Sequence, residues 1–190
     1  MTMAAALLAV TMNAQNKIGE ISIAPTLGLN FAKLTGDGVS NVKSTTQLVI
    51  GANLEYGVSK DFGVTGGLFY SMQGAKFKGS NATMNLDYLN IPILANYYVA
   101  KGLALKAGLQ PGFLLSAKAK AKSDGESYSS DIKDDCNGID FAIPVGASYE
   151  ISNFVIDARY NIGLSSVNDD GDAAKNSVVQ ITVGYKFKLK

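Results

Sequence analysis

The sequence contains no histidine and only one cysteine, and these shortages exclude several kinds of active site. Histidine is the commonest general base and the ligand of most catalytic zinc sites. The single cysteine, Cys136, excludes an intrachain disulfide and a thiolate metal cluster. Cys136 lies in a polar stretch without a histidine to activate it, so we interpret it as an incidental loop thiol. We therefore expect no enzymatic activity, no metal and no cofactor.

Charge and long apolar runs are also scarce. Charged residues make up 17% of the 190 residues and the net charge is +1, which gives no electrostatic footprint for nucleic acid. No later segment approaches the run of about 18 apolar residues that a spanning helix requires. If the protein lies in a membrane, it must therefore cross with strands.

The first residues resemble a secretory signal peptide. An apolar run from Met3 to Val10 is followed by small residues, and Ala14 suits a cleavage position. We assign residues 1–14 to a signal peptide and residues 15–190 to one folded domain. No lysine or arginine precedes the run, and a buried first strand or helix is the alternative.

Residues 139–164 carry the clearest pattern, that of a β-hairpin turning at Ser152-Asn153. One register places apolar pairs on one face, from Ile151/Phe154 to Phe141/Leu164, and mostly small or polar pairs on the other. A slip of one residue would reverse every side chain, so agreement over this length indicates a real pairing. An asparagine in a two-residue loop suits the positive φ of tight hairpins.

The same alternation recurs in six further segments, residues 20–33, 46–58, 62–77, 86–99, 103–122 and 178–190. Short turns at 59–61, 100–102 and 152–153 alternate with long polar loops at 34–44, 78–83, 123–136 and 168–176. The pattern predicts an all-β, eight-stranded antiparallel up-and-down barrel, since closure removes the exposed edges of such a sheet.

Barrels of this kind are either soluble and lipocalin-like, with the apolar face around a lipophilic ligand, or transmembrane, with the apolar face toward lipid. The polar face here is rich in small residues that fit a narrow interior, whereas a solvated exterior would carry Lys and Glu. Short turns at one end and long loops at the other are typical of outer-membrane barrels. We therefore predict the transmembrane kind, and a secreted soluble barrel is the alternative.

Aromatic residues of the apolar face gather near the short turns, where their rings suit a membrane–water interface. The predicted interface aromatics are Tyr56, Phe62, Tyr97, Tyr149, Phe154, Tyr185 and Phe187.

Charged residues of mixed sign fall on the predicted inner face, and most lie toward the short turns. They are Glu55, Lys106, Asp140, Glu150, Asp157, Arg159 and Lys186. Because an eight-stranded interior is just filled by side chains and buried charges need partners, we predict a neutralised network that plugs the lumen. A narrow ion path between these charges is the alternative.

Residues near the long loops allow two further interpretations. In 116–122, SAKAKAK, lysines predicted to point inward alternate with alanines. They either form a solvated strand end or attract acidic sugars or lipid phosphates. Acidic residues in 131–135 and 169–172 are either solvated or hold Ca²⁺, without EF-hand spacing. We favour the solvated interpretation for both. All four prolines fall inside predicted strands, and a common bulge at Pro92 and Pro111 would accommodate two of them.

Several segments resemble the PorT-type outer-membrane β-barrel family of Bacteroidetes: 86–94 (LDYLNIPIL), 108–115, 156–164 (IDARYNIGL) and 184–187 (GYKF). The resemblance covers nearly the whole chain after residue 14. It implies an outer-membrane location and, for some members, a part in protein secretion or envelope assembly. We therefore expect a monomeric integral protein of the cell outer membrane, with a structural or interaction role, whose partners are membrane lipid and secretion or envelope proteins.

Overall fold

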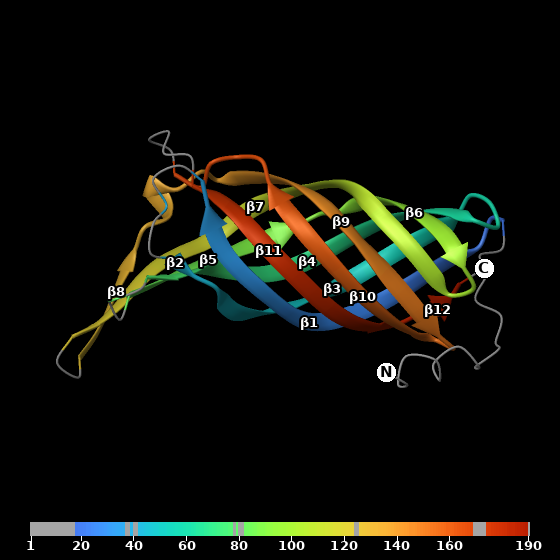
Figure 1. Cartoon of the computed structure of the whole chain (residues 1–190), viewed down its shortest axis with the longest axis horizontal. Helices are drawn as coiled ribbons and strands as arrows, with labels where there is room; N and C mark the ends of the chain where they lie inside the picture. Colours follow the sequence, from blue (N-terminus) through green and yellow to red (C-terminus); the bar gives the residue numbers. More distant parts are fainter. Residues whose placement is uncertain are drawn as a thin grey trace, which may run out of the picture.

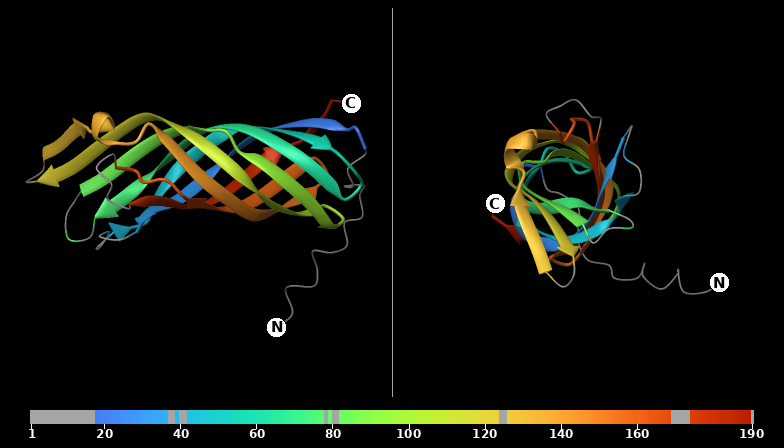
Figure 2. Two further views of the ribbon diagram at one scale, coloured as in Figure 1. Left: turned by 90° about the horizontal axis from the view of Figure 1, so that it is seen from above. Right: turned by 90° about the vertical axis from the view of Figure 1, so that its left-hand side faces the viewer.

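The computed structural model describes residues 18–36, 39, 42–77, 79, 82–123, 126–168 and 174–189. These residues form an elongated barrel of tilted strands (Figure 1), which is a closed ring when seen end-on (Figure 2). The predicted signal peptide, residues 1–14, lies outside the described residues and stays a prediction.

Twelve strands and one short 3-10 helix are present in this part of the chain. The elements are β1 (Ile21–Thr35), β2 (Val42–Lys43), β3 (Thr45–Gly57), β4 (Phe62–Phe77), β5 (Ala82–Asn90), β6 (Ile93–Ala100), β7 (Leu103–Ser123), β8 (Glu126–Asp131), η2 (Lys133–Asp135), β9 (Ile139–Ile151), β10 (Phe154–Gly163), β11 (Lys175–Tyr185) and β12 (Phe187–Lys188).

The strand pairings are antiparallel and follow a path that closes on itself. The path runs β1–β3–β4–β5–β7–β9–β10–β11 and returns to β1. An antiparallel all-β barrel is therefore confirmed, but the structure has twelve strands where the sequence predicted eight. The difference arises because two predicted strands are interrupted, between β5 and β6 and between β11 and β12, and because β2 and β8 form inside predicted loops.

The interruption between β5 and β6 falls at Pro92, which has no N–H to donate to a ladder. Asn90 before the gap and Ile93 after it pair with β7 in the same register. No residue is therefore inserted here, and the predicted common bulge of Pro92 with Pro111 is wrong. The gap removes ladder hydrogen bonds, but the side chains before and after it keep the same inward and outward alternation.

Pro25 has a similar effect where the first and last long strands meet. Thr26 of β1 pairs with β11, and Ile23 of β1 pairs with β12. Between these two residues, β1 has no partner on this side in the described part of the chain. Lys186, opposite the lapse, donates its backbone N–H to the carbonyl of Asn153 at 2.7 Å, on the side of β10. This local loss of pairing separates β12 from β11.

The hairpin of β9 and β10 has the register predicted from the sequence, in all ten of its residue pairs. The turn differs in one respect, since the positive φ of 57° belongs to Ser152 and not to Asn153. The side chain of Asn153 instead donates a hydrogen bond to the carbonyl of Lys186 at 3.1 Å. Gly102, in the turn before β7, has a positive φ of 77°.

The apolar face of the barrel points outward. Leu27 is 65% exposed and Leu109 62%, whereas the inward-facing Asn30 is fully buried and Thr182 is 1% exposed. This arrangement does not favour the soluble barrel with its apolar face around a ligand. Among the described residues, no helix is long and apolar enough to cross a bilayer.

A β-bulge in β7 changes which face its last residues occupy. The register between β5 and β7 shifts by one residue at Leu115, so that Leu114 and Ala117 are both buried and Lys118 and Lys120 are exposed on the outer face. The prediction that these lysines point inward is therefore wrong, because one inserted residue reverses the alternation that follows it. Beyond the bulge, β7 pairs with β8 in a hairpin that projects past the barrel (Figure 1).

Candidate functional site

The inner wall of the barrel brings together a buried acid and two buried cations. Asp157 of β10 accepts a hydrogen bond from the Nζ of Lys106 at 2.9 Å and from the Nε of Arg159 at 2.6 Å. All three side chains are at most 6% exposed. Lys106 and Arg159 are separated by Gly146 of the intervening strand β9, which has no side chain to keep them apart. Buried ions require such partners.

The guanidinium of Arg159 is only partly satisfied by this contact. Among the described residues, Nη1 and Nη2 have no hydrogen-bond partner, and the ring centre of Phe69 lies 5.5 Å from the guanidinium carbon. A cation over an aromatic face is attracted by the ring quadrupole. This trio has two positive charges and one negative charge, so it carries a formal excess of +1.

A second group nearer the short turns has the opposite balance. Lys186, between β11 and β12, forms ion pairs with Glu55 of β3, at 3.4 Å, and with Glu150 of β9. The hydroxyl of Tyr98 lies 2.5 Å from Glu55 and 3.1 Å from Glu150. Its one proton can serve one carboxylate at a time. The two acids and one lysine carry a formal excess of −1.

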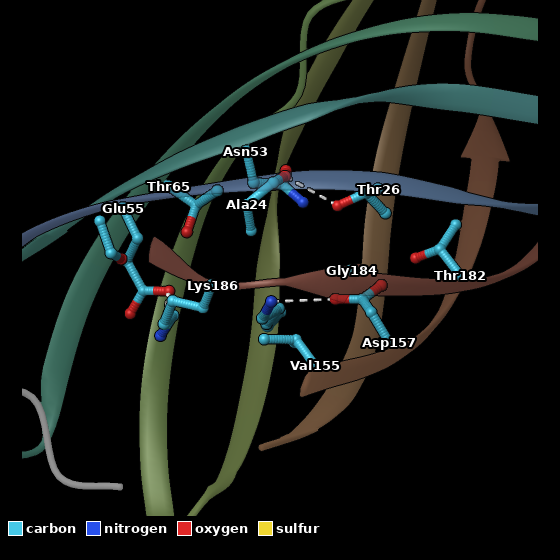
Figure 3. Close-up of a pocket in the computed structure, with 12 residues that line it drawn as sticks. Ala24, Thr26, Asn53, Glu55, Thr65, Val155, Asp157, Thr182, Gly184 and Lys186 are labelled. Atoms are coloured by element: carbon cyan, nitrogen blue, oxygen red, sulfur yellow. Dashed lines mark hydrogen bonds and ion pairs between the residues drawn. The ribbon is translucent and has the colours of Figure 1, made fainter. Parts of the chain in front are cut away.

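The two groups line one small cavity and together are neutral. Glu55, Asp157 and Lys186 surround the cavity with small residues of the wall, as Figure 3 shows. Lys106 also lines the cavity. Its volume is about 20 Å³, room for about one water molecule. The three acids and three cations cancel formally, which is the arrangement that a low-dielectric interior favours.

Asp140 is the one predicted member of the charge network that lies apart from the other six. It is 5% exposed, near the long-loop end, and it accepts hydrogen bonds at 3.3 Å from Ser165 and from Asn176. The same Asn176 amide also donates to the hydroxyl of Tyr88 at 3.2 Å. Neutral donors, rather than a cation, solvate this carboxylate.

An apolar cluster fills the lumen at the long-loop end, and the sequence analysis missed it. Its buried members are Leu34, Ala75, Leu86, Tyr88, Leu114, Ala117, Cys136 and Val167. Cys136 is thus a core residue and not the incidental loop thiol predicted. One signal in the sequence could have indicated the cluster. Leu34 is apolar but lies on the same inward face of its strand as Asn30.

Two loop segments contribute side chains to this cluster, Cys136 from one and Val167 from the other. The amide of Asn137 donates to the carbonyls of Ser166 and Asn168, at 2.9 and 3.0 Å. The backbone N–H of Asn137 donates to the carbonyl of Val167 at 2.8 Å, and Cys136 bridges to Asn168. These bonds hold the segments against each other, and side chains from both enter the apolar cluster.

Comparisons with known proteins agree with this architecture. Residues 13–169 match the family described as "Outer membrane protein beta-barrel domain". The chain belongs to this family. The family is one of outer-membrane proteins, so the protein lies in the outer membrane.

Two solved structures illustrate the likeness of the fold of this outer-membrane barrel. Ail, the attachment invasion locus protein of Yersinia pestis, is 24% identical with a TM-score of 0.58, covering 90% of this chain and all of Ail. Neisserial surface protein A is 13% identical with a TM-score of 0.53, covering 88% of this chain and 97% of that one. Comparison with curated protein sequences gave no match.

The predicted interface aromatics of this outer-membrane barrel lie at the strand ends beside the short turns. Phe62 pairs directly with Tyr97, and Phe154 pairs with Tyr185. The rings of Phe154 and Tyr185 meet edge to face, with centroids 5.2 Å apart. Of the remaining three, Tyr56 and Phe187 are exposed and Tyr149 is half-buried.

The acidic loops offer no preorganised cation site in the described part of the chain. No group of three or more potential metal ligands occurs there. Asp131 accepts a hydrogen bond from the backbone N–H of Lys133 at 2.9 Å. Residues 169–172, the other acidic segment, lie outside the described residues.

Proposed function

We propose that this outer-membrane protein acts through contacts made by its surface and long loops, without transport through its lumen and without catalysis. The proposal is supported by buried side chains at three levels inside the barrel. They are the neutral charge network, buried amides such as Asn30 and Gln73, and the apolar cluster under the loop segments. A solute would have to displace all three.

We propose that the barrel wall has eight strand positions around its circumference. It is supported by β6, which has the same neighbours as β5, and by β12, which follows β11 along β1. A barrel of this size has an interior just wide enough for side chains. We propose further that the long loops face outward from the cell, as long loops of such barrels do.

A finer proposal is that the protein belongs to the PorT-type subgroup and assists protein secretion or envelope assembly. The quoted resemblance in 86–94 and 156–164 supports it. A contact role agrees with a blocked lumen, because an accessory protein needs a presented surface and no pore.

Conductance in a planar bilayer tests the proposal that the lumen is blocked. We expect no unitary currents from the folded protein, with a porin as the positive control and mobility on an unboiled gel as the check of folding. Steady unitary currents would instead support the narrow ion path between the buried charges.

A deletion strain tests the accessory role. We expect secreted or envelope proteins to be mislocalised, and restored by the wild-type gene. A photo-crosslinking residue at Tyr128 of β8 should capture an envelope protein, and one at Lys60 in a short turn should not capture it. Unchanged secretion and envelope composition in the deletion strain would reject the accessory role.

A further inference from the structure

Three exposed lysines form a row across neighbouring strands near the long-loop end. Lys43 of β2 pairs directly with Lys76 of β4, Lys76 pairs with Thr83 of β5, and Thr83 pairs with Lys120 of β7. The sequence separates these lysines widely, and the sheet brings them onto one side of the wall.

This lysine row (Lys43, Lys76 and Lys120) faces away from the lumen. The bulge at Leu115 reverses the phase of β7, so that Lys120 follows the outward-facing, exposed Phe113 and Leu115 along the outer wall. Without the bulge, the end of β7 would direct its lysines inward. The outward direction places the ammonium groups where membrane lipid surrounds the barrel.

The height of the row matches the lipid headgroups. The outward-facing residues of β7 are apolar or small from Leu103 to Leu115. At about 3.3 Å per residue and a tilt of about 40°, this stretch rises about 30 Å along the barrel axis, close to the thickness of the hydrocarbon core. Lys120 and its row neighbours therefore lie just beyond the hydrocarbon, at the level of the headgroup phosphates.

The lysines of the row lie close to one another across the sheet. Like charges directly opposite each other, as in Lys43 and Lys76, destabilise a sheet. Within the described ranges, none of the three lysines forms an ion pair with a carboxylate. An anion from outside the chain would remove the repulsion. Lysine stems can also lie along apolar surface while the ammonium stays in the polar layer.

We propose that the lysine row binds the phosphate groups of outer-leaflet lipid headgroups. Each ammonium supplies three donors to phosphate oxygens, and two or more lysines match the double charge of a phosphomonoester. The acyl chains of such a lipid lie against the apolar wall immediately below the row. The choice of the outer leaflet rests on the proposed outward orientation of the long loops.

Lipid retention by the full-length protein in nanodiscs tests the proposal. The probe is a glycolipid carrying two phosphates, and its enzymatically dephosphorylated form is the comparison. Native mass spectrometry measures the fraction of each that stays bound. The test variant is K76Q/K120Q, and the matched control is K60Q/K101Q, which removes two exposed lysines from the short-turn end.

We expect wild type and control to retain the phosphorylated lipid in preference to the dephosphorylated one. The test variant should bind it about 25-fold more weakly, about fivefold for each lysine near a charged membrane surface. Equal retention of both lipids by the wild type, or an equal loss in K60Q/K101Q, would overturn the proposal, as would binding only of a soluble sulfated polysaccharide. A nanodisc exposes both leaflets, so this result is independent of orientation, which protease access to the long loops in whole cells tests separately.

Discussion

Arg159 and Asp157 lie two residues apart on one face of β10, with Nε 2.6 Å from Oδ1 and both side chains almost fully buried. A strand places residues i and i+2 on the same side, so this ion pair needs no partner from elsewhere in the chain. Lys106 then adds a second cation to the same carboxylate. Asp157 is therefore the only carboxylate that holds these two buried cations in the described chain.

Replacing Asp157 with Asn should destabilise the barrel strongly. The change leaves two cations buried without a counter-charge, and breaking a buried pair in this way costs about 3–5 kcal/mol. Urea titration of the protein in lipid vesicles, followed by gel mobility, measures the free energy of unfolding. The comparison is Glu20→Gln at the more exposed ion pair with Lys188, where a loss below about 1 kcal/mol is expected. Similar losses in both variants would contradict the assigned role of Asp157.

Tyr98→Phe should also destabilise the protein, because the hydroxyl donates to a buried carboxylate of Glu55 or Glu150. Hydrogen bonds to charged groups contribute about 1.5–3 kcal/mol. Its neighbour in sequence supplies the control, since Tyr97 points outward and is 57% exposed. The same unfolding titration should show little change for Tyr97→Phe, and equal effects of the two would argue against the network.

Gly74 and Gly66 both lie on β4 but differ in the space around them, so they can serve as test and control. Gly74 has a φ of 131°, and an added Cβ would lie 2.0 Å from the carbonyl oxygen of Met84. Gly66 has open space around its Cβ position. Gly74→Ala should therefore cost about 1–3 kcal/mol or prevent folding, and Gly66→Ala should have little effect. Unfolding titration or, for a variant that does not fold, unshifted gel mobility distinguishes these outcomes.

Cys136 should react slowly with iodoacetamide in the folded protein. Burial, and secondarily the charge of Asp135, raises the pKa of the thiol. Because the thiolate is the reactive form, a raised pKa means a smaller reactive fraction at any given pH and a rate that increases at higher pH than in the urea-unfolded protein. A cysteine introduced as Ser129→Cys in a Cys136→Ser background supplies the exposed reference. Equal rates for the two cysteines would contradict the burial of Cys136.

The sequence predicted those features that depend on alternation alone. The register of β9 and β10 followed from the pairing of apolar with apolar residues, because a shift of one residue would have reversed every face. The shared face of residues such as Asp157 and Lys186 followed in the same way. That the apolar face points outward required further signals, namely the small residues of the polar face and the unequal lengths of turns and loops.

The features that the sequence did not predict depend on interruptions of that alternation. The bulge at Leu115 changes the phase where alanines and lysines alternate, and alanine fits either face. The position of Asp140 could not be separated from the network, since its partners Ser165 and Asn176 come from distant segments. The burial of Cys136 depends on two loops that meet only in the folded chain.

The lapse in pairing at Pro25 lies where the two ends of the sheet meet and close the barrel. The contact between β1 and β11 joins the two ends of the sequence, and pairings of such long separation form slowly. On its other side, Lys186 is bonded through its backbone to Asn153 in the turn between β9 and β10. The last strand is therefore held in register by β10 on one side even where its pairing with β1 lapses on the other.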